Sequence, residues 1–221
     1  MITLVVEAST YAGSTALLEG SRLLGERSVA MRGKEFEALM QAVGDLLSDC
    51  AVAPGQIARV VCGGGPGSFT SLRIAGSIAK GIAMAVGAEL VPISSLALLV
   101  ASLGPHEAGH FLACADAMRG ESYVQTFELG SDGRLSATSE QFVVPTSSVE
   151  EVAATRGARA VGASRSGADC VVPHARSAVR ITNMIDMTPP ADLASWEPIY
   201  GRLAEAQVKW EAVHGRPLAA G

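Results

Sequence analysis

The first half of the chain alternates short runs of apolar residues with longer stretches in which apolar residues recur at helical spacing. A β-branched apolar run over residues 2–6 and a second run over residues 14–18, on either side of Tyr11-Ala-Gly13, predict a hairpin. Leu39, Val43 and Leu46 follow the spacing of one helix face. The order expected is three strands, a helix, a strand and a helix, over residues 2–6, 14–18, 22–30, 36–47, 57–62 and 70–86.

The second half repeats this order with no sequence similarity to the first. Turns at Met118-Arg-Gly120 and Gly130-Ser-Asp-Gly133 separate its strands. The expected elements are strands at 111–115, 122–129 and 135–144, a helix at 147–154 and a strand at 158–161. Two copies of one order predict an α/β protein with the duplicated ribonuclease-H-like fold of the actin-like ATPases (ASKHA), in which two similar subdomains each hold a mixed sheet and helices.

A boundary near Gly104-Pro105 would divide the chain into an N-terminal subdomain, 1–104, and a C-terminal subdomain, 105–221. The second part would end in a tail with a last helix from about residue 199 to residue 213. The first seven residues lack a basic segment, and no uninterrupted apolar run approaches the ~20 residues of a membrane helix. We therefore expect a cytoplasmic protein without a membrane contact.

Composition narrows the classes of partner. Apolar residues make up 48% of the chain and charged residues 18%, which favours a compact globule. The four cysteines are widely separated and are expected to be reduced core residues. A net charge of -5 argues against a broad electrostatic contact with nucleic acid, because phosphate binding depends on clustered Lys and Arg.

The turn from Gly63 to Ser68, between a predicted strand and a predicted helix, holds four glycines. Such a turn can bind an anion at the helix N-terminus, or it can simply allow close helix-to-sheet packing. It is no Walker A loop, because no Lys follows its last glycine at the required position. The candidates for a nucleotide or anion contact are Ser9, Thr10, Gly67 and Ser68, and turn capping explains the same residues equally well.

Three linked segments resemble the hallmark of the TsaB family in residues and spacing. They are Gly65-Pro-Gly-Ser-Phe-Thr-Ser-Leu-Arg73, Ile74-Ala-Gly-Ser-Ile-Ala-Lys-Gly81 and Val91-Pro-Ile-Ser-Ser-Leu96. Residues 115–124 and 197–202 extend the resemblance over nearly the whole chain. The resemblance implies a non-catalytic scaffold for a TsaD-like enzyme, which transfers threonylcarbamoyl to N6 of adenosine 37 in tRNAs reading codons that begin with A.

The same resemblance implies the partners. A TsaE-like ATPase would complete the assembly, the chain alone would form a homodimer, and tRNA would be contacted only through the complex. No cofactor would be required, although ATP or ADP could bind weakly at the subunit junction. The residues expected to contact the partner subunit or a second copy lie on the first two helices, and the alternative is that they face the rest of this chain: Ala38, Gln41, Ala42, Asp45, Ile74, Ser77, Gly81 and Met84.

Two departures from related patterns argue against catalysis by this chain. The His-x-x-x-His metal pair of TsaD falls here on Ser95 and Leu99, which offer no imidazole to a transition metal. TsaB members usually show Asp-Thr-Ser-Thr near the first turn, where this chain has Glu7-Ala-Ser-Thr10. We therefore expect neither a catalytic residue nor a metal ligand.

Two enzymatic alternatives remain. A stand-alone actin-like ATP-dependent phosphotransferase or ATPase would need Glu7 and Asp116 to hold magnesium. A metallo- or serine protease-like hydrolase has less support. Its H-E-x-x-H match, His106-Glu-Ala-Gly-His110, is preceded by Pro105 and contains Gly109, so the required helix has no room. The segment Gly162-Ala-Ser-Arg-Ser166 has Ser where a nucleophile elbow needs its second Gly.

Overall fold

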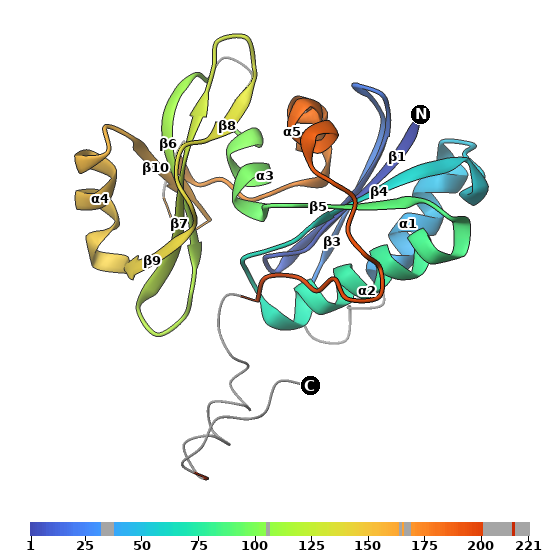
Figure 1. Cartoon of the computed structure of the whole chain (residues 1–221), viewed down its shortest axis with the longest axis horizontal. Coiled ribbons are helices and arrows are strands. Elements are labelled where there is room, and N and C mark those ends of the chain that lie inside the picture. Colours follow the sequence, from blue (N-terminus) through green and yellow to red (C-terminus); the bar gives the residue numbers. More distant parts are fainter. Residues whose placement is uncertain (32–37, 105–106, 164, 166–168, 201–213, 215–221) are drawn as a thin grey trace.

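The computed structural model describes residues 1–31, 38–104, 107–163, 165, 169–200 and 214. Figure 1 shows two sheets beside each other, each with helices packed against it. A segment near the end of the chain, drawn in orange and red, returns to the first sheet.

Sheet A has five strands in the order β3-β2-β1-β4-β5. The first three form an antiparallel meander, and β4 and β5 extend the sheet in parallel from β1. This is the strand order of the ribonuclease-H-like fold. The bounds are Ile2–Glu7 (β1), Ala12–Glu19 (β2), Arg22–Ala30 (β3), Ile57–Gly63 (β4) and Glu89–Ile93 (β5).

Helices Ala38–Asp49 (α1) and Phe69–Val86 (α2) pack on one face of sheet A, and a 3-10 turn at Pro54–Gln56 (η2) leads into β4. Because β1 is buried on both faces, its apolar run is continuous and its side chains alternate between two cores. Leu4 faces α1 and α2, whereas Val5 faces the opposite side. By length and composition alone α2 could cross a membrane, but one side of it is part of the core of sheet A.

Sheet B repeats the plan with a parallel strand beside an antiparallel meander, in the order β10-β6-β7-β8, with β9 also paired to β7. The strand expected over residues 135–144 is two strands, which pair with different parts of β7. The prediction of a duplicated ribonuclease-H-like fold is confirmed. The bounds are Gly109–Asp116 (β6), Glu121–Leu129 (β7), Leu135–Ala137 (β8), Phe142–Pro145 (β9), Thr146–Ser148 (η3), Val149–Thr155 (α4) and Arg159–Gly162 (β10).

Between the sheets lies the short helix Ser95–Ala101 (α3), which the sequence pattern did not predict. All seven of its residues are buried, so the run has no polar face from which a helical period could be recognised. Its leucines share one cluster with Val5 of sheet A and with Phe111 and Phe127 of sheet B. The helix therefore joins the two halves through a single apolar core.

After sheet B the chain returns to sheet A through Ala175–Arg180 (η5) and Thr182–Met187 (α5). Ala175, Ala178, Ile181 and Ile185 enter the core around α3. The boundary near residue 104 stays a prediction. The structure adds that part of the segment assigned to the second subdomain packs on the first.

Residues 188–200, here called the C-terminal strap, cross β5 and α2. The Ala191 N-H donates to the Leu90 carbonyl at 2.7 Å, and Lys80 Nζ donates to the Trp196 carbonyl at 2.9 Å. The Tyr200 ring centroid lies 4.7 Å from that of Phe69. The helix expected from residue 199 therefore does not begin there, and residues 201–213 lie outside the described part of the chain.

Two glycines of α2 test the packing of the C-terminal strap. A Cβ at Gly76 would lie 3.0 Å from Pro198 Cγ, whereas a Cβ at Gly81 would meet open space. In a helix interior Gly→Ala stabilises by about 1 kcal/mol. We expect Gly81→Ala to gain this amount and Gly76→Ala to gain clearly less or to destabilise, as measured by urea unfolding at one fixed protein concentration. Equal gains at the two positions would contradict the packing described.

Candidate functional site

The backbone of the glycine turn, Gly63 to Ser68, is bonded to the chain's own acceptors. Gly64 N-H donates to the Ile93 carbonyl at 2.7 Å, and Ser68 N-H donates to the Ser9 carbonyl at 2.7 Å. Gly65 N-H donates to Ser95 Oγ at 3.2 Å. These three donors are therefore engaged without an anion, and the close-packing interpretation of the turn accounts for them.

The glycines of this turn each make room for a different neighbour. A side chain at Gly63 would collide with the carboxyl of Glu7, and one at Gly67 would collide with the backbone of Ser9. Gly65 has a φ of 93° and would meet the carbonyl of Ile199 in the C-terminal strap. The turn thus needs glycine because the first hairpin and the C-terminal strap approach it closely.

Glu7, at the end of β1, is completely buried below the turn. Its Oε1 accepts the Ser9 N-H at 2.5 Å, and its Oε2 accepts the Ser95 hydroxyl at 2.9 Å. Burial raises the pKa of Glu7 above its ordinary value, and the hydrogen bonds from Ser9 and Ser95 oppose that rise. Burial and the nearby Glu7 also raise the pKa of Cys62. In both groups, burial disfavours the charged form.

Ser95 and Leu99, the positions at which the resemblance to TsaD predicts metal histidines, serve packing in this chain. Ser95 begins α3, and its oxygen is already shared between Gly65 N-H and Glu7. Leu99 is 2% exposed and belongs to the core between the sheets. Neither side chain is a nitrogen or sulfur donor, so the residues present do not fit a transition metal.

Of the four nucleotide candidates, Ser9, Gly67 and Ser68 lie close together, and Thr10 and Ser68 have hydrogen-bond partners within the chain. Gly67 lies against Ser9, and Ser68 Oγ accepts the Ser71 hydroxyl at 3.1 Å. Thr10 Oγ1 closes its own turn with Ala12, as acceptor and donor at 3.2 Å. Nucleotide contact by these residues stays a prediction, and local capping explains their present contacts.

Most of the predicted partner surface is exposed on one side of α1 and α2. Ala38 and Ile74 are half-buried, and Ala42 is 7% exposed, so these three offer less surface to a partner than the others. Two exposed methionines, Met40 and Met84, flank this surface, and Met40 was missed because its spacing also fits a core position. We define the α1–α2 face as the exposed residues Met40, Gln41, Gly44, Asp45, Ser77, Gly81, Met84 and Ala85.

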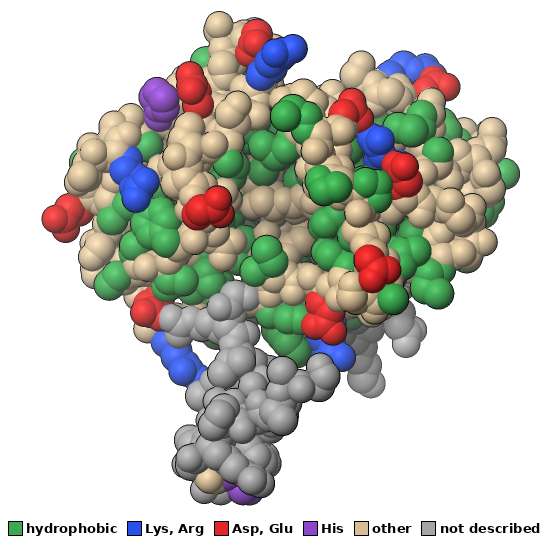
Figure 2. Space-filling model, in the orientation of Figure 1, with side chains coloured by type: hydrophobic (Ala, Val, Ile, Leu, Met, Phe, Trp, Pro, Cys, Tyr) green, Lys and Arg blue, Asp and Glu red, His purple; other side chains and the backbone are tan. Residues whose placement is uncertain are grey.

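Basic side chains form no large field on the face seen in Figure 2, where Lys and Arg are scattered among acidic and uncharged groups. Many of the arginines are paired with carboxylates, including those at positions 22, 27, 59, 134, 159, 165 and 176. An arginine that is paired with a carboxylate is less available to a phosphate group.

One polar cluster missed in the sequence joins β3 to the segment before η5. His174 Nε2 lies 2.9 Å from Ser28 Oγ, and His174 Nδ1 lies 3.9 Å from Glu26 Oε2. The order of groups resembles a hydrolase triad, but Nδ1 accepts the Arg176 N-H at 3.1 Å. The neutral ring therefore carries its proton on Nε2 and cannot remove the proton of Ser28. No short sequence signal could reveal residues this far apart.

The H-E-x-x-H segment has no helix in the described residues. His110 is an exposed residue of β6, and Glu107 pairs with Arg159 at 3.2 Å. His106 lies outside the described residues, as do Ser164 and Ser166 of the elbow-like segment. Because His110 lies in a strand, it cannot be the second histidine of a helical H-E-x-x-H zinc site.

Comparison with known proteins shows the family of the chain. The model of the family described as TsaD, tRNA N6-adenosine threonylcarbamoyltransferase, matches residues 34–175. The protein named tRNA threonylcarbamoyladenosine biosynthesis protein TsaB from Bacillus subtilis is 32% identical over 128 residues, which is 58% of this chain and 56% of that protein. The protein of the same name from Haemophilus influenzae is 31% identical over 121 residues, covering 54% of this chain and 51% of its own length. The match thus spans just over half the length of these relatives.

The fold has a close counterpart among solved structures. YeaZ from Pseudomonas aeruginosa superimposes with a TM-score of 0.74 at 24% identity, covering 90% of this chain and 99% of that one. At this identity the likeness establishes the fold alone. The named relatives are TsaB proteins. Because the family model matches well over half of the chain, the chain belongs to the TsaD family.

Proposed function

We propose that the chain is a non-catalytic scaffold subunit that supports a TsaD-like enzyme. The supported reaction is threonylcarbamoyl transfer to N6 of adenosine 37 in tRNAs reading codons that begin with A. The observation that carries this proposal is the buried contact between Glu7 and Ser95. The Glu7–Ser95 contact fills the region between β1 and α3 with side chains that serve packing. A catalytic protein of the TsaD type would need accessible metal ligands in that region.

The α1–α2 face is the proposed contact with the TsaD-like subunit, or with a second copy when the chain is alone. Met40 and Met84 are half or more exposed on it, and methionine suits adaptable apolar contacts. A Cβ at Gly81 would meet open space, and Ser77 is small and exposed, so another helix could approach closely here. A TsaE-like ATPase would complete the assembly in the cytoplasm, with no membrane contact.

We further propose that tRNA is contacted only through the complex, because the described arginines are largely paired with acids. No cofactor would be needed by this chain. ATP or ADP at the subunit junction remains compatible with the proposal, through Ser9, Thr10, Gly67 and Ser68, if the partner supplies the remaining contacts.

The alternative of a stand-alone ATPase meets a physical obstacle. Magnesium binds accessible carboxylate oxygens and keeps several waters, but both oxygens of Glu7 are buried and hydrogen-bonded. Asp116, the second ligand that this alternative needs, is exposed and accepts the Met118 N-H at 2.7 Å. Nothing in the described contacts favours this activity over the scaffold.

The proposed contact can be tested by placing a long, charged side chain on the α1–α2 face. Ser77→Arg and Gly81→Arg should each weaken binding of a TsaD-like subunit by tenfold or more, about 1.4 kcal/mol, because an unpaired charge would be buried. Binding is measured by isothermal calorimetry with purified proteins. Ala154→Arg, at an exposed small residue of α4, is the matched control and should bind as the parent does. Unchanged binding in both α2 variants would remove this face from the proposal.

Substitution of Glu7 by Gln separates a packing role from a ligand role. Burial raises the pKa of Glu7, so the folded chain favours the protonated carboxyl. The part of the unfolding free energy that depends on this protonated form is complete below the ordinary pKa of 4.5 and is lost as pH rises through the folded-state pKa. Glu7→Gln should remove this loss, which can reach about 1.4 kcal/mol per pH unit. Urea unfolding between pH 5 and pH 8 measures it, with Glu140→Gln, on an exposed carboxyl, as control. A variant whose unfolding free energy keeps the parent's pH slope would contradict the assignment.

Magnesium-ATP turnover distinguishes the scaffold from the stand-alone enzyme. We expect the purified chain alone to hydrolyse ATP at the rate of a buffer blank, measured as released phosphate. Turnover that exceeds the blank and disappears in Glu7→Ala would support the enzymatic alternative instead.

A further inference from the structure

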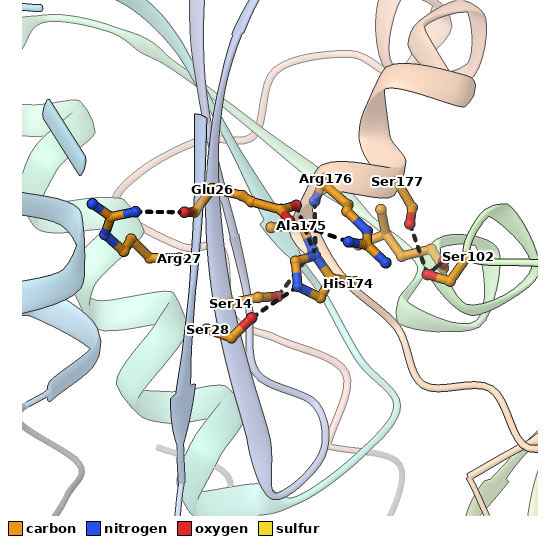
Figure 3. A network of polar contacts seen from close by, with 10 residues as sticks. Ser14, Glu26, Arg27, Ser28, Ser102, His174, Ala175, Arg176 and Ser177 are labelled. Atoms are coloured by element: carbon orange, nitrogen blue, oxygen red, sulfur yellow. Dashed lines mark hydrogen bonds and ion pairs between the residues drawn. The ribbon is translucent and has the colours of Figure 1, made fainter. Parts of the chain in front are cut away.

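The segment η5 is the point at which the chain, after leaving sheet B, is attached again to sheet A. Ala175 N-H donates to Ser14 Oγ of β2 at 2.9 Å, and Ser177 and Ser102 of the α3 region share a hydrogen bond of 2.8 Å. Figure 3 shows these contacts on either side of His174, the residue that caps the N-terminus of η5. The position of η5 in turn sets the start of α5 and of the C-terminal strap.

The ring of His174 uses both nitrogens in the structure. Its Nδ1 accepts the Arg176 N-H at 3.1 Å and so satisfies a backbone donor at the start of η5. In a neutral imidazole the other nitrogen then carries the proton, and His174 Nε2 donates to Ser28 Oγ at 2.9 Å. The cap therefore requires the neutral ring.

Glu26 places a second group beside the same ring nitrogen. Its Oε1 accepts Arg176 Nη1 at 3.1 Å, but its Oε2 is buried and has no hydrogen-bond partner. This oxygen lies 3.9 Å from His174 Nδ1. An unpaired buried acceptor is unfavourable, and a proton on Nδ1 would supply the donor that Oε2 lacks.

We propose that His174 is a proton-operated switch at the attachment of η5, with two mutually exclusive states of one nitrogen. In the neutral state, Nδ1 accepts from the Arg176 N-H and caps η5. In the protonated state, Nδ1 releases that N-H and donates to Glu26 Oε2. One nitrogen cannot accept and donate at the same time, so protonation exchanges a cap within η5 for an ion pair with β3.

Among the described residues, the charged groups that act on the ring are Glu26 of β3 and Arg176 of η5. Arg27, the next residue of β3, points to the other side of the strand and pairs with Asp49 of α1. From β2 the nearby side chain is the uncharged Ser14. Burial lowers the pKa of His174 below its ordinary 6.5, the Glu26 carboxylate opposes this, and Arg176 adds to it.

The direction of the switch follows from this shift. The capped state is complete above pH 6.5, and its stability is lost as pH falls through the folded-state pKa. At neutral pH η5 is capped. Acidification releases the Arg176 N-H from Nδ1 and pairs the ring with Glu26 of β3. The hydrogen bonds at the start of η5 therefore change, while Ala175 and Ala178 stay in the core.

The test is a nuclear magnetic resonance titration of the labelled full chain from pH 8 to pH 4.5. The neutral His174 ring should show nitrogen shifts of the Nε2-H tautomer. The Arg176 amide and the Glu26 carboxyl signals should both move at the midpoint of His174, and the Arg176 amide should exchange faster with solvent below it. His110, an exposed imidazole in β6, provides the internal reference.

Two variants distinguish the switch from ordinary titration. Glu26→Gln should shift the His174 midpoint to lower pH, because the stabilising carboxylate is gone. Ser28→Ala is the control, since it removes only the Nε2 acceptor and should leave the joint movement of the Arg176 amide and His174 in place. An Nδ1-H tautomer at neutral pH, or Arg176 and Glu26 signals that do not follow His174 in the unmodified chain, would overturn the proposal.

Discussion

A carboxyl group buried away from water is the constraint on which the centre of this fold depends. Glu7 lies where β1 ends, beneath the glycine turn and against the first residue of α3. The backbone of Ser9 and the hydroxyl of Ser95 satisfy its oxygens, and no room remains at Gly63 for a side chain. Because an unsatisfied buried carboxyl is costly, these groups have to be placed together. The local arrangement is therefore determined by packing around one acid.

The same arrangement explains why a sequence that looks like an anion loop has a structural role. The turn contacts the hairpin through Gly67, α3 through Gly65 and the C-terminal strap through Gly64 and Gly65. The C-terminal strap then runs along one side of α2 at Gly76 and Lys80, while Ser77, Gly81 and Met84 remain exposed. Helix α2 thus connects the buried acid to the surface proposed for partner binding.

Local sequence patterns predicted much of the fold, because β1 to β4, α1 and α2 have clear alternating or helical spacing. They did not predict α3, whose seven residues are all buried, or the division of residues 135–144 into two strands by pairing with β7. Both the helix α3 and the division into β8 and β9 depend on contacts with distant parts of the chain. The burial of Ala42 was not predicted for a similar reason, since a small side chain fits a surface and a core position equally well, and only the rotation of α1 shows which applies.

Parts of the candidate site lay beyond any local pattern. The resemblance indicated that Ser95 and Leu99 replace metal ligands, but it could not indicate that Ser95 bonds to Glu7, 88 residues earlier. The cluster of His174 with Ser28 and Glu26 joins positions about 150 residues apart, and it depends on how the chain returns to sheet A. Contacts of this kind follow from the completed fold.

The central claim is that this chain supports tRNA modification as a scaffold without using Glu7 as a ligand. The most direct measurement is the threonylcarbamoyladenosine content of tRNA, by nucleoside mass spectrometry, in cells depleted of the chain and then supplied with the parent or with Glu7→Gln. The account predicts that depletion lowers the modification and that both forms restore it to the same level. Unchanged modification after depletion, or a folded Glu7→Gln chain that fails to restore it, would contradict the account.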